Sequence, residues 1–291
     1  MLIHDIEFTF GADPEVFVKK GNKNVSAHGL IPGTKAEPFP VNKGAVQVDG
    51  MALEFNIEPA KSAIGFKENL ATVLKQMGDM VPDHTLVIKP TMNFSKKVME
   101  ESPEEALALG CEPDYNAYTE DMNPRPKAPG NFRTGGGHIH IGWDNDIPID
   151  DPSHLDACRA VVKQMDAYIG VLSLLWDDDD KRRSVYGKAG AFRPKSFGVE
   201  YRSLSNAWLA HPEIHASLVL LMSRALSSLF VYGGKPITST TINDQKVRPE
   251  DIINSGDKDM ALSYVQNYLM YTARGPVLEI CEELDIDCWG Y

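Results

Sequence analysis

Two histidines at alternate positions, His138 and His140, stand in the glycine-rich segment 134–142. The segment predicts a short strand, and since successive strand side chains point to opposite faces, both imidazoles are expected on one face. No bulky side chain directly precedes them, so a metal or a phosphate-bearing ligand has room to approach. The alternative is a pair of half-buried strand histidines beside a bulge, and this segment by itself does not decide between the two.

Acidic side chains recur with the same period near the N-terminus. Residues 5–18 alternate like a strand, which Pro14 interrupts because proline cannot donate to a sheet. Asp13 and Glu15 nevertheless fall on one face. A solvated turn is the alternative interpretation, and it applies most strongly to Asp13.

A second acidic strand is predicted within residues 48–59. Glu54, Asn56 and Glu58 line one face of it, as they would in any amphipathic strand. Three oxygen-bearing side chains without a cation between them are less usual, because their repulsion raises a carboxyl pKa or requires a bound cation.

Basic residues follow later in the chain. Residues 181–195 interleave lysines and arginines with glycines, a pattern that suits a polyphosphate because Arg pairs with planar oxygens and Gly lets backbone donors approach. A basic surface loop is the alternative. Residues 197–206 then predict a strand running into a loop, with Glu200 and Arg202 on one face.

Together these segments predict a mostly oxygen donor set with a minority of histidine, which suits Mg²⁺ or Mn²⁺ better than a structural Zn²⁺. A metal beside Lys and Arg side chains is typical of phosphoryl transfer. The sequence has no Walker-type Gly-Lys-Ser/Thr loop, no Gly-x-Ser-x-Gly elbow and no convincing cysteine nucleophile.

Amphipathic helices are expected to support these strands. Apolar stripes of helical period predict helices near residues 63–78, 151–176, 211–232 and 257–272. The four aspartates 177–180 are interpreted as a solvated helix end. The polar segment 20–47 is expected to form a hairpin and a long loop, and a basic approach to the histidine strand offers Arg125, Lys127 and Arg133 to anions.

Bulk composition limits the class of protein. The chain has 291 residues, 43% hydrophobic and 24% charged, with a net charge of −12, so a general nucleic-acid or anionic-membrane binder is not expected. We expect one domain over residues 1–291, no signal peptide, no membrane span, and a monomer or small homo-oligomer in the cytoplasm. The cysteines are expected to be free thiols, although Cys281 and Cys288 could meet.

The ordered set of motifs resembles the phage and bacterial carboxylate–amine ligases, type 2, within the glutamine synthetase and glutamate–cysteine ligase superfamily. The resemblance rests on five motifs: Gly11-Ala-Asp-Pro-Glu15, Glu54-Phe-Asn-Ile-Glu58-Pro, Gly136-Gly-His-Ile-His-Ile-Gly142, Tyr186-Gly-Lys-Ala-Gly-Ala-Phe-Arg193 and Gly198-Val-Glu-Tyr-Arg202-Ser-Leu-Ser-Asn. Each motif is weak alone, whereas their order is more specific. Asp13-Pro-Glu15 departs from the family's Glu-x-Glu pair, since aspartate is shorter.

The resemblance implies an α+β fold, with an antiparallel sheet curved into an open funnel or half-barrel and helices packed on its outer face. It implies Mg²⁺, or Mn²⁺, bound beneath the phosphates of ATP. The implied metal ligands are Asp13, Glu15, Glu54, Glu58, His138, His140 and Glu200. The implied nucleotide ligands are His140, Arg182, Lys188, Arg193 and Arg202, and the implied catalytic residues are Glu58, Arg193 and Arg202.

The implied reaction joins a carboxylate to an amine, of a small molecule or a peptide, through an acyl phosphate with release of ADP. Two alternatives remain open at this stage: a metal-dependent phosphotransferase or hydrolase, and a non-catalytic nucleotide-binding phage protein. The residues do not identify the acid or the amine, because specificity resides in loops.

Overall fold

The first of the two larger antiparallel sheets carries the histidine strand. The computed structural model describes residues 7–107, 114–124 and 130–289, so Arg125 and Lys127 lie outside the described residues. In this part of the chain, five strands form the first sheet. Their order is β1 (Thr9–Ala12), β11 (Ile139–Gly142), β13 (Gly198–Tyr201), β12 (Ala191–Lys195) and β9 (Tyr115–Asn116).

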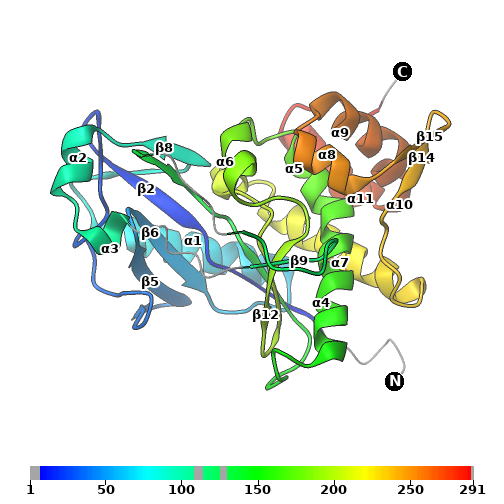
Figure 1. The fold of residues 1–291 in the computed structure, drawn as a ribbon, viewed down its shortest axis with the longest axis horizontal. Helices are drawn as coiled ribbons and strands as arrows, with labels where there is room; N and C mark the ends of the chain where they lie inside the picture. Colours follow the sequence, from blue (N-terminus) through cyan, green and yellow to red (C-terminus); the bar gives the residue numbers. More distant parts are fainter. Residues whose placement is uncertain (1–6, 108–113, 125–129, 290–291) are drawn as a thin grey trace.

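The second sheet carries the Glu54 strand. Its order is β3 (Lys23–Val25), β2 (Glu15–Lys20), β6 (Ala52–Ile57), β5 (Gly44–Asp49) and β4 (Phe39–Val41), with β7 (Thr85–Val87) also paired with β2. Strands β1 and β2 are separated only by Asp13 and Pro14. The chain therefore passes directly from one sheet to the other, and a single antiparallel surface curves across the molecule (Figure 1).

Helices cover the outer face of this surface. Helix α1 (Ala63–Met80) begins at the N-cap Ser62, whose side chain accepts a hydrogen bond from the Gly65 amide, and packs on β5 and β6. Helix α4 (Pro152–Met165) packs on β12 and β13, and α7 (His215–Val231) packs on both α1 and α4. The α+β class and the curved sheet with helices on its outer face are thus confirmed.

The helical layer differs from the expected long rods in two places. The segment expected as one helix over 151–176 contains a π-helical turn, η2 (Asp166–Gly170), followed by α5 (Val171–Ser173). The segment expected over 257–272 divides into α9 (Lys258–Tyr264), a second π-helical turn η4 (Val265–Leu269) and α10 (Met270–Thr272). All five residues of η2 are buried, so no one-sided apolar pattern marks the wider turn in the sequence.

The remaining elements lie outside the sheets and their main helices. They are α2 (Lys96–Glu101), α3 (Glu104–Leu107), the pair β8 (Thr91–Asn93) and β10 (Phe132–Thr134), α6 (Asp180–Val185), the 3₁₀ helix η3 (Asn206–Ala210), the hairpin β14 (Thr240–Ile242) and β15 (Gln245–Val247), α8 (Pro249–Ser255) and α11 (Arg274–Glu283). No helix among the described residues is long and apolar enough to cross a membrane.

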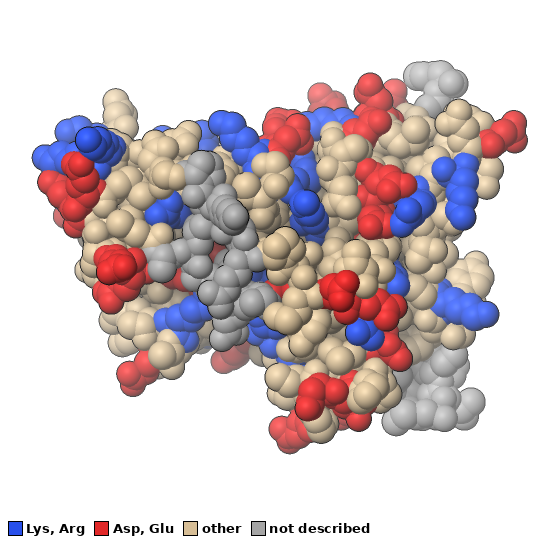
Figure 2. All heavy atoms as spheres, in the orientation of Figure 1, with Lys and Arg blue, Asp and Glu red and all other residues tan. Residues whose placement is uncertain are grey.

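Two sequence-based interpretations are corrected here. Asp177 is only 4% exposed and pairs with Arg183, Oδ2 to Nη1 at 3.3 Å, so the aspartate run is not simply a solvated helix end. Cys281 and Cys288 form a disulfide rather than two free thiols, because the turn after α11 brings their Cα atoms to 6.4 Å. Acidic and basic side chains are interspersed over the face shown in Figure 2.

Glycine at position 137 is required by close backbone packing. A Cβ there would lie 2.2 Å from the Ser205 carbonyl oxygen and 2.5 Å from Trp208 Nε1. The Gly137 carbonyl also accepts a hydrogen bond from that indole at 3.0 Å, directly before His138. The segment after β13 thus fixes where the histidine strand begins.

We predict that Gly137→Ala lowers the free energy of unfolding by about 2–3 kcal/mol, because the Ser205 backbone and the buried Trp208 indole must both move. Gly275→Ala in α11 is the control, since nothing lies within 4 Å of its added Cβ and alanine favours a helix. Urea titration of both variants gives the comparison. Equal stability of the two would show that the approach at Gly137 is not constraining.

Candidate active site

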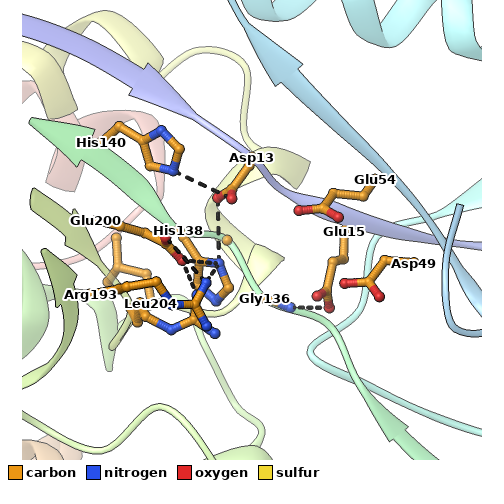
Figure 3. Close-up of polar contacts among 12 residues, drawn as sticks. Asp13, Glu15, Asp49, Glu54, Gly136, His138, His140, Arg193, Glu200 and Leu204 are labelled. Atoms are coloured by element: carbon orange, nitrogen blue, oxygen red, sulfur yellow. Dashed lines mark hydrogen bonds and ion pairs between the residues drawn. The ribbon is translucent and has the colours of Figure 1, made fainter. Parts of the chain in front are cut away.

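Asp13 lies where the chain crosses between the sheets, and it contacts both histidines. Its Oδ1 is 3.4 Å from His138 Nδ1 and its Oδ2 is 3.3 Å from His140 Nε2 (Figure 3). The backbone sets this position: the Asp13 amide donates to the His138 carbonyl at 3.3 Å, and the Glu15 amide donates to the Gly136 carbonyl at 2.9 Å. Proline at 14 has no donor to lose at this crossing.

A row of cross-strand neighbours brings Glu200 to the same place. Gly11 on β1, His140 on β11, Glu200 on β13 and Arg193 on β12 are paired in register, so their side chains share one face. Glycine at position 11 leaves the space beside His140 open. One ligand atom each from Asp13, His140 and Glu200 lies within 4.8 Å of the others, and we call these three residues the cation cluster.

The donor set of the cation cluster fits a hard divalent cation. Two carboxylates and one imidazole offer the oxygen-rich ligands that suit Mg²⁺ or Mn²⁺. Asp13 Oδ1 and His140 Nε2 are buried and make no aligned hydrogen bond within the part of the chain that the structure describes. Asp13 Oδ1 lies at ion-pair distance from His138 and His140 Nε2 at ion-pair distance from Asp13 Oδ2, so both atoms keep capacity for a further ligand.

Three cations surround Glu200, which is fully buried. Lys195 Nζ lies 2.7 Å and Arg193 Nη1 3.5 Å from Glu200 Oε2, while Arg202 Nη1 contacts Oε1. Arg202 also pairs with Asp114, Nε to Oδ2 at 3.2 Å, and donates to the Tyr186 hydroxyl. Glu200 therefore lies between the acids that could bind a metal ion and the cations that could bind an anion.

The two histidines differ electrostatically. Burial and the charge of Arg202 lower the pKa of His138 to about 4, so this imidazole is neutral. Burial also acts to lower the pKa of His140, but the charges of Asp13 and Glu200 outweigh it and raise the value. Burial would raise the pKa of Asp13, yet His140 and His138 hold it well below its ordinary value. Asp13 is therefore the ionised centre of the cluster.

A second acidic group lies on the other side of Asp13 (Figure 3). Glu15 and Glu54 are register partners on β2 and β6. Glu15 Oε2 accepts a hydrogen bond from the Gly136 amide at 2.7 Å, and Glu54 Oε2 accepts one from Gln47 at 2.7 Å. Burial and the charge of Asp49 raise the pKa of Glu15 to about 7. Burial together with Asp13 and Asp49 raises that of Glu54 well above normal. Glu15 and Glu54 therefore lose their protons less readily than ordinary carboxyl groups.

Asp49 was not identified from the sequence, where it reads as part of a turn. In the structure it ends β5 next to β6 and pairs with Lys35, Oδ2 to Nζ at 2.8 Å. Its alternation with Gln47, which is paired across from Glu54, was the available signal. Lys195 was recognised only as one of many cations, and Asp114 only as part of a polar loop.

Three sequence-predicted residues lie apart from this cluster. The Glu58 side chain is 59% exposed and pairs with Lys43, because β6 ends at Ile57 and the alternation stops there. Lys188 is exposed on the loop before β12. Arg182 is 1% exposed, and its guanidinium donates to the carbonyls of Arg202, Ser203 and Leu204. Burial lowers the pKa of Arg182 to about 10, and we leave it out of the proposed nucleotide site.

A pocket of about 730 Å³ opens beside the cation cluster. Asp13, Glu54 and His140 line its inner end, and Trp143 and Phe197 supply aromatic walls. This volume falls within the ordinary range for small-molecule sites. Acids and a histidine thus line this pocket, and Arg193, Lys195 and Arg202 lie close by around Glu200.

The family described as "Phage phiEco32-like COOH.NH2 ligase-type 2" matches residues 128–248. This match includes the histidine strand, the Tyr186 to Arg193 motif and Glu200 with Arg202, and it confirms the resemblance. It does not reach the acidic strands near Asp13 and Glu54. No curated protein is significantly similar to the chain.

Two solved structures are similar over 96% of this chain. A bifunctional glutathione synthetase from Pasteurella multocida has 12% sequence identity and a TM-score of 0.45, and 45% of that chain is covered. A structure described as a novel glutamine synthase homolog has 11% identity and a TM-score of 0.42, with 66% of that chain covered. The chain thus spans less than half the length of the first protein.

The raised pKa of Glu15 predicts a pH-dependent stability in the metal-free protein. Between its ordinary pKa of 4.5 and its folded value of about 7, the native state holds a proton that the unfolded state has lost. Stability from this group is therefore complete below pH 4.5 and is lost as pH rises through 7.

Glu15→Gln should remove this dependence. The free energy of unfolding of the variant minus that of the wild type should grow by up to roughly 3 kcal/mol from pH 5 to pH 8. Urea titrations in EDTA at four pH values measure this difference, and subtracting the wild type cancels the titration of the histidines. A difference that does not change with pH would contradict the assignment.

Proposed function

We propose that the chain is an ATP-dependent carboxylate–amine ligase that releases ADP. One observation carries the proposal: Glu200 belongs to the cation cluster with Asp13 and His140, and its carboxylate is also contacted by Arg193, Lys195 and Arg202. The family match over residues 128–248 supports the same reaction class. We place this reaction in the cytoplasm, where ATP is available.

The cation cluster would hold one Mg²⁺, or Mn²⁺. The other proposed metal ligands are Glu15, Glu54 and His138. When bound, the metal supplies positive charge that neutralises the oxygens of the transferring phosphoryl group. Glu58 is omitted from the proposed ligands, because its carboxylate points to solvent beside Lys43.

The basic residues would bind the phosphates of ATP. Arg193, Lys195 and Arg202 already contact Glu200, so phosphate oxygens bound there lie next to the cation cluster. Lys188 is exposed on the preceding loop and supports the outer phosphates. The nucleoside fits the 730 Å³ pocket, where the rings of Trp143 and Phe197 offer apolar contact to a base.

The reaction proceeds in two steps. A substrate carboxylate oxygen attacks the γ-phosphorus of ATP, the bond to the β-phosphate oxygen breaks, and ADP leaves with its electron pair. The amine nitrogen then attacks the carbonyl carbon of the acyl phosphate, the bond from that carbon to the phosphate oxygen breaks, inorganic phosphate leaves with the electron pair, and the nitrogen gives its proton to water. Arg193 and Arg202 stabilise the charge on the phosphoryl oxygens in both steps. The acid and the amine are small molecules or peptides.

Binding of Mg-ATP tests the site directly. We predict that Glu200→Gln weakens Mg-ATP binding by roughly tenfold or more. The substitution removes the charge of a residue that belongs to the cation cluster and also holds Arg193, Lys195 and Arg202 in place. The matched control is Glu58→Gln, which changes an exposed carboxylate in the same way and should alter the dissociation constant less than about twofold. Titration calorimetry gives both values. A larger loss for Glu58→Gln than for Glu200→Gln would reverse the assignment.

Product analysis tests the reaction class. With mixtures of candidate acids and amines, ADP and an amide product should appear in equal amounts. ADP or phosphate formed without amide would instead identify a phosphotransferase or hydrolase acting through the same cluster. Wild-type protein that binds no Mg-ATP in the presence of millimolar Mg²⁺ would refute the nucleotide proposal.

A further inference from the structure

We propose that Asp166, in the outer helical layer, is a positioning residue that holds the loop of residues 187–190 and strand β13 as one unit. We call residues 187–190 the glycine loop. The consequence for ATP rests on the proposed function, whereas the positioning itself is a property of the fold. Asp166 touches none of the proposed ligands, and it acts through the elements on which they stand.

Asp166 is fully buried, and its carboxylate binds three donors from two separate segments. Oδ2 accepts a hydrogen bond from the Gly190 amide at 2.7 Å. Oδ1 accepts one from the Tyr201 hydroxyl at 2.6 Å and one from the Ser203 hydroxyl at 3.2 Å. These three donors are neutral hydrogen-bonding groups. Burial raises the pKa of Asp166 to about 7, while the bonds from Tyr201 and Gly190 oppose that shift.

Tyr201 and Ser203 alternate with the active-site residues of the same segment. Glu200 and Arg202 face the cation cluster, and Tyr201 points to the helical layer because neighbouring strand residues face opposite ways. The Arg202 amide also donates to the Ala191 carbonyl at 2.9 Å, which ties the segment to β12. The Asp166 carboxylate, on the outer face of the sheet, therefore fixes the position of Glu200 and Arg202 on the inner face.

Both residues between the two glycines of the glycine loop make backbone hydrogen bonds. Gly187 and Gly190 have φ values of +72° and +79°, which favour glycine. The Ala189 amide donates to Asn254 Oδ1 on α8 at 3.0 Å, and the Lys188 carbonyl accepts from Ser203 at 3.0 Å. With the bond from Gly190 to Asp166, side chains of the helical layer fix a loop whose only exposed side chain is Lys188.

The π-helical turn provides the space for this contact. Asp166 opens the turn η2 and Gly170 closes it. A Cβ on Gly170 would lie 2.6 Å from the Tyr201 hydroxyl, so glycine there makes a socket for the end of the tyrosine side chain. Wide turns of this kind are frequent at functional sites. An ordinary helix with any other residue at 170 would exclude the hydroxyl from Asp166.

Amide hydrogen exchange of the wild type and three variants tests the positioning without assuming a reaction. Asp166→Ala removes all three bonds and should speed exchange of the Gly190 amide by roughly tenfold or more. Asp166→Asn should restore most of the protection, since its carbonyl can accept from Gly190 and its amide can donate to the tyrosine oxygen. Val162→Ala is the control, because Val162 is fully buried on α4 and purely apolar.

Mg-ATP calorimetry on the same proteins then tests the consequence. Asp166→Ala should weaken Mg-ATP binding by roughly tenfold, with recovery in Asp166→Asn, while Val162→Ala lowers the melting temperature but leaves the affinity within about twofold. Cleavage by trypsin after Lys188 should accelerate only in Asp166→Ala.

Two results would overturn the assignment. One is a Gly190 amide that exchanges equally fast in wild type and Asp166→Ala. The other is a Val162→Ala variant that reproduces every effect of Asp166→Ala, which would mean that general stability and not positioning is responsible. A wild type without Mg-ATP affinity would instead refute the ligase proposal, and the hydrogen-exchange comparison would still decide the role of Asp166.

Discussion

Electrostatic repulsion among buried carboxylates is the constraint on which this structure depends. Asp13 stands between the other two members of the cation cluster, His140 and Glu200, and the pair Glu15 and Glu54, and the curvature of the sheet brings all of them to one side. The histidines and the three bases around Glu200 compensate one end of this row. At the other end, burial and the charges of neighbouring acids keep the carboxyl pKa values of Glu15 and Glu54 raised.

The crossing between the sheets creates this arrangement. Because β1 continues into β2 through Asp13 and Pro14, the carboxylates of Asp13 and Glu15 are attached to different sheets but lie only two residues apart. Strand β11 pairs with β1 on one side of this crossing, and β6 pairs with β2 on the other. The segment after β13 fixes the start of β11 through its contacts with Gly137. Asp166, in the helical layer, fixes β13 through Tyr201.

Local periodicity accounts for what the sequence could predict. The alternation of side chains along strands placed His138 with His140 and identified Glu54, and the helical spacing of apolar residues located α1 and α7. The register between strands is not local. It decides that Glu200 pairs with His140 and that Asp49 approaches Glu15, and no pattern within one segment contains this information. Glu58 follows the alternation on paper, but its strand ends one residue earlier.

Buried polar partners were the least predictable feature. Arg182 lies in the same basic segment as Arg193, residues 181–195, yet three carbonyl groups hold it inside the protein. Asp166 resembles an ordinary polar position in an amphipathic helix until residues 190, 201 and 203 are folded around it. Charge and spacing therefore indicated the kind of chemistry, while tertiary contacts decided which charged residues remain available for it.

The most direct test is anomalous diffraction from crystals grown with Mn²⁺ and a non-hydrolysable ATP analogue. We predict a manganese peak at about 2.2 Å from one donor atom each of Asp13, His140 and Glu200, with the terminal phosphate of the analogue on the side of Arg193 and Arg202. Manganese bound elsewhere, or a bound analogue with no metal at these three residues, would contradict the account.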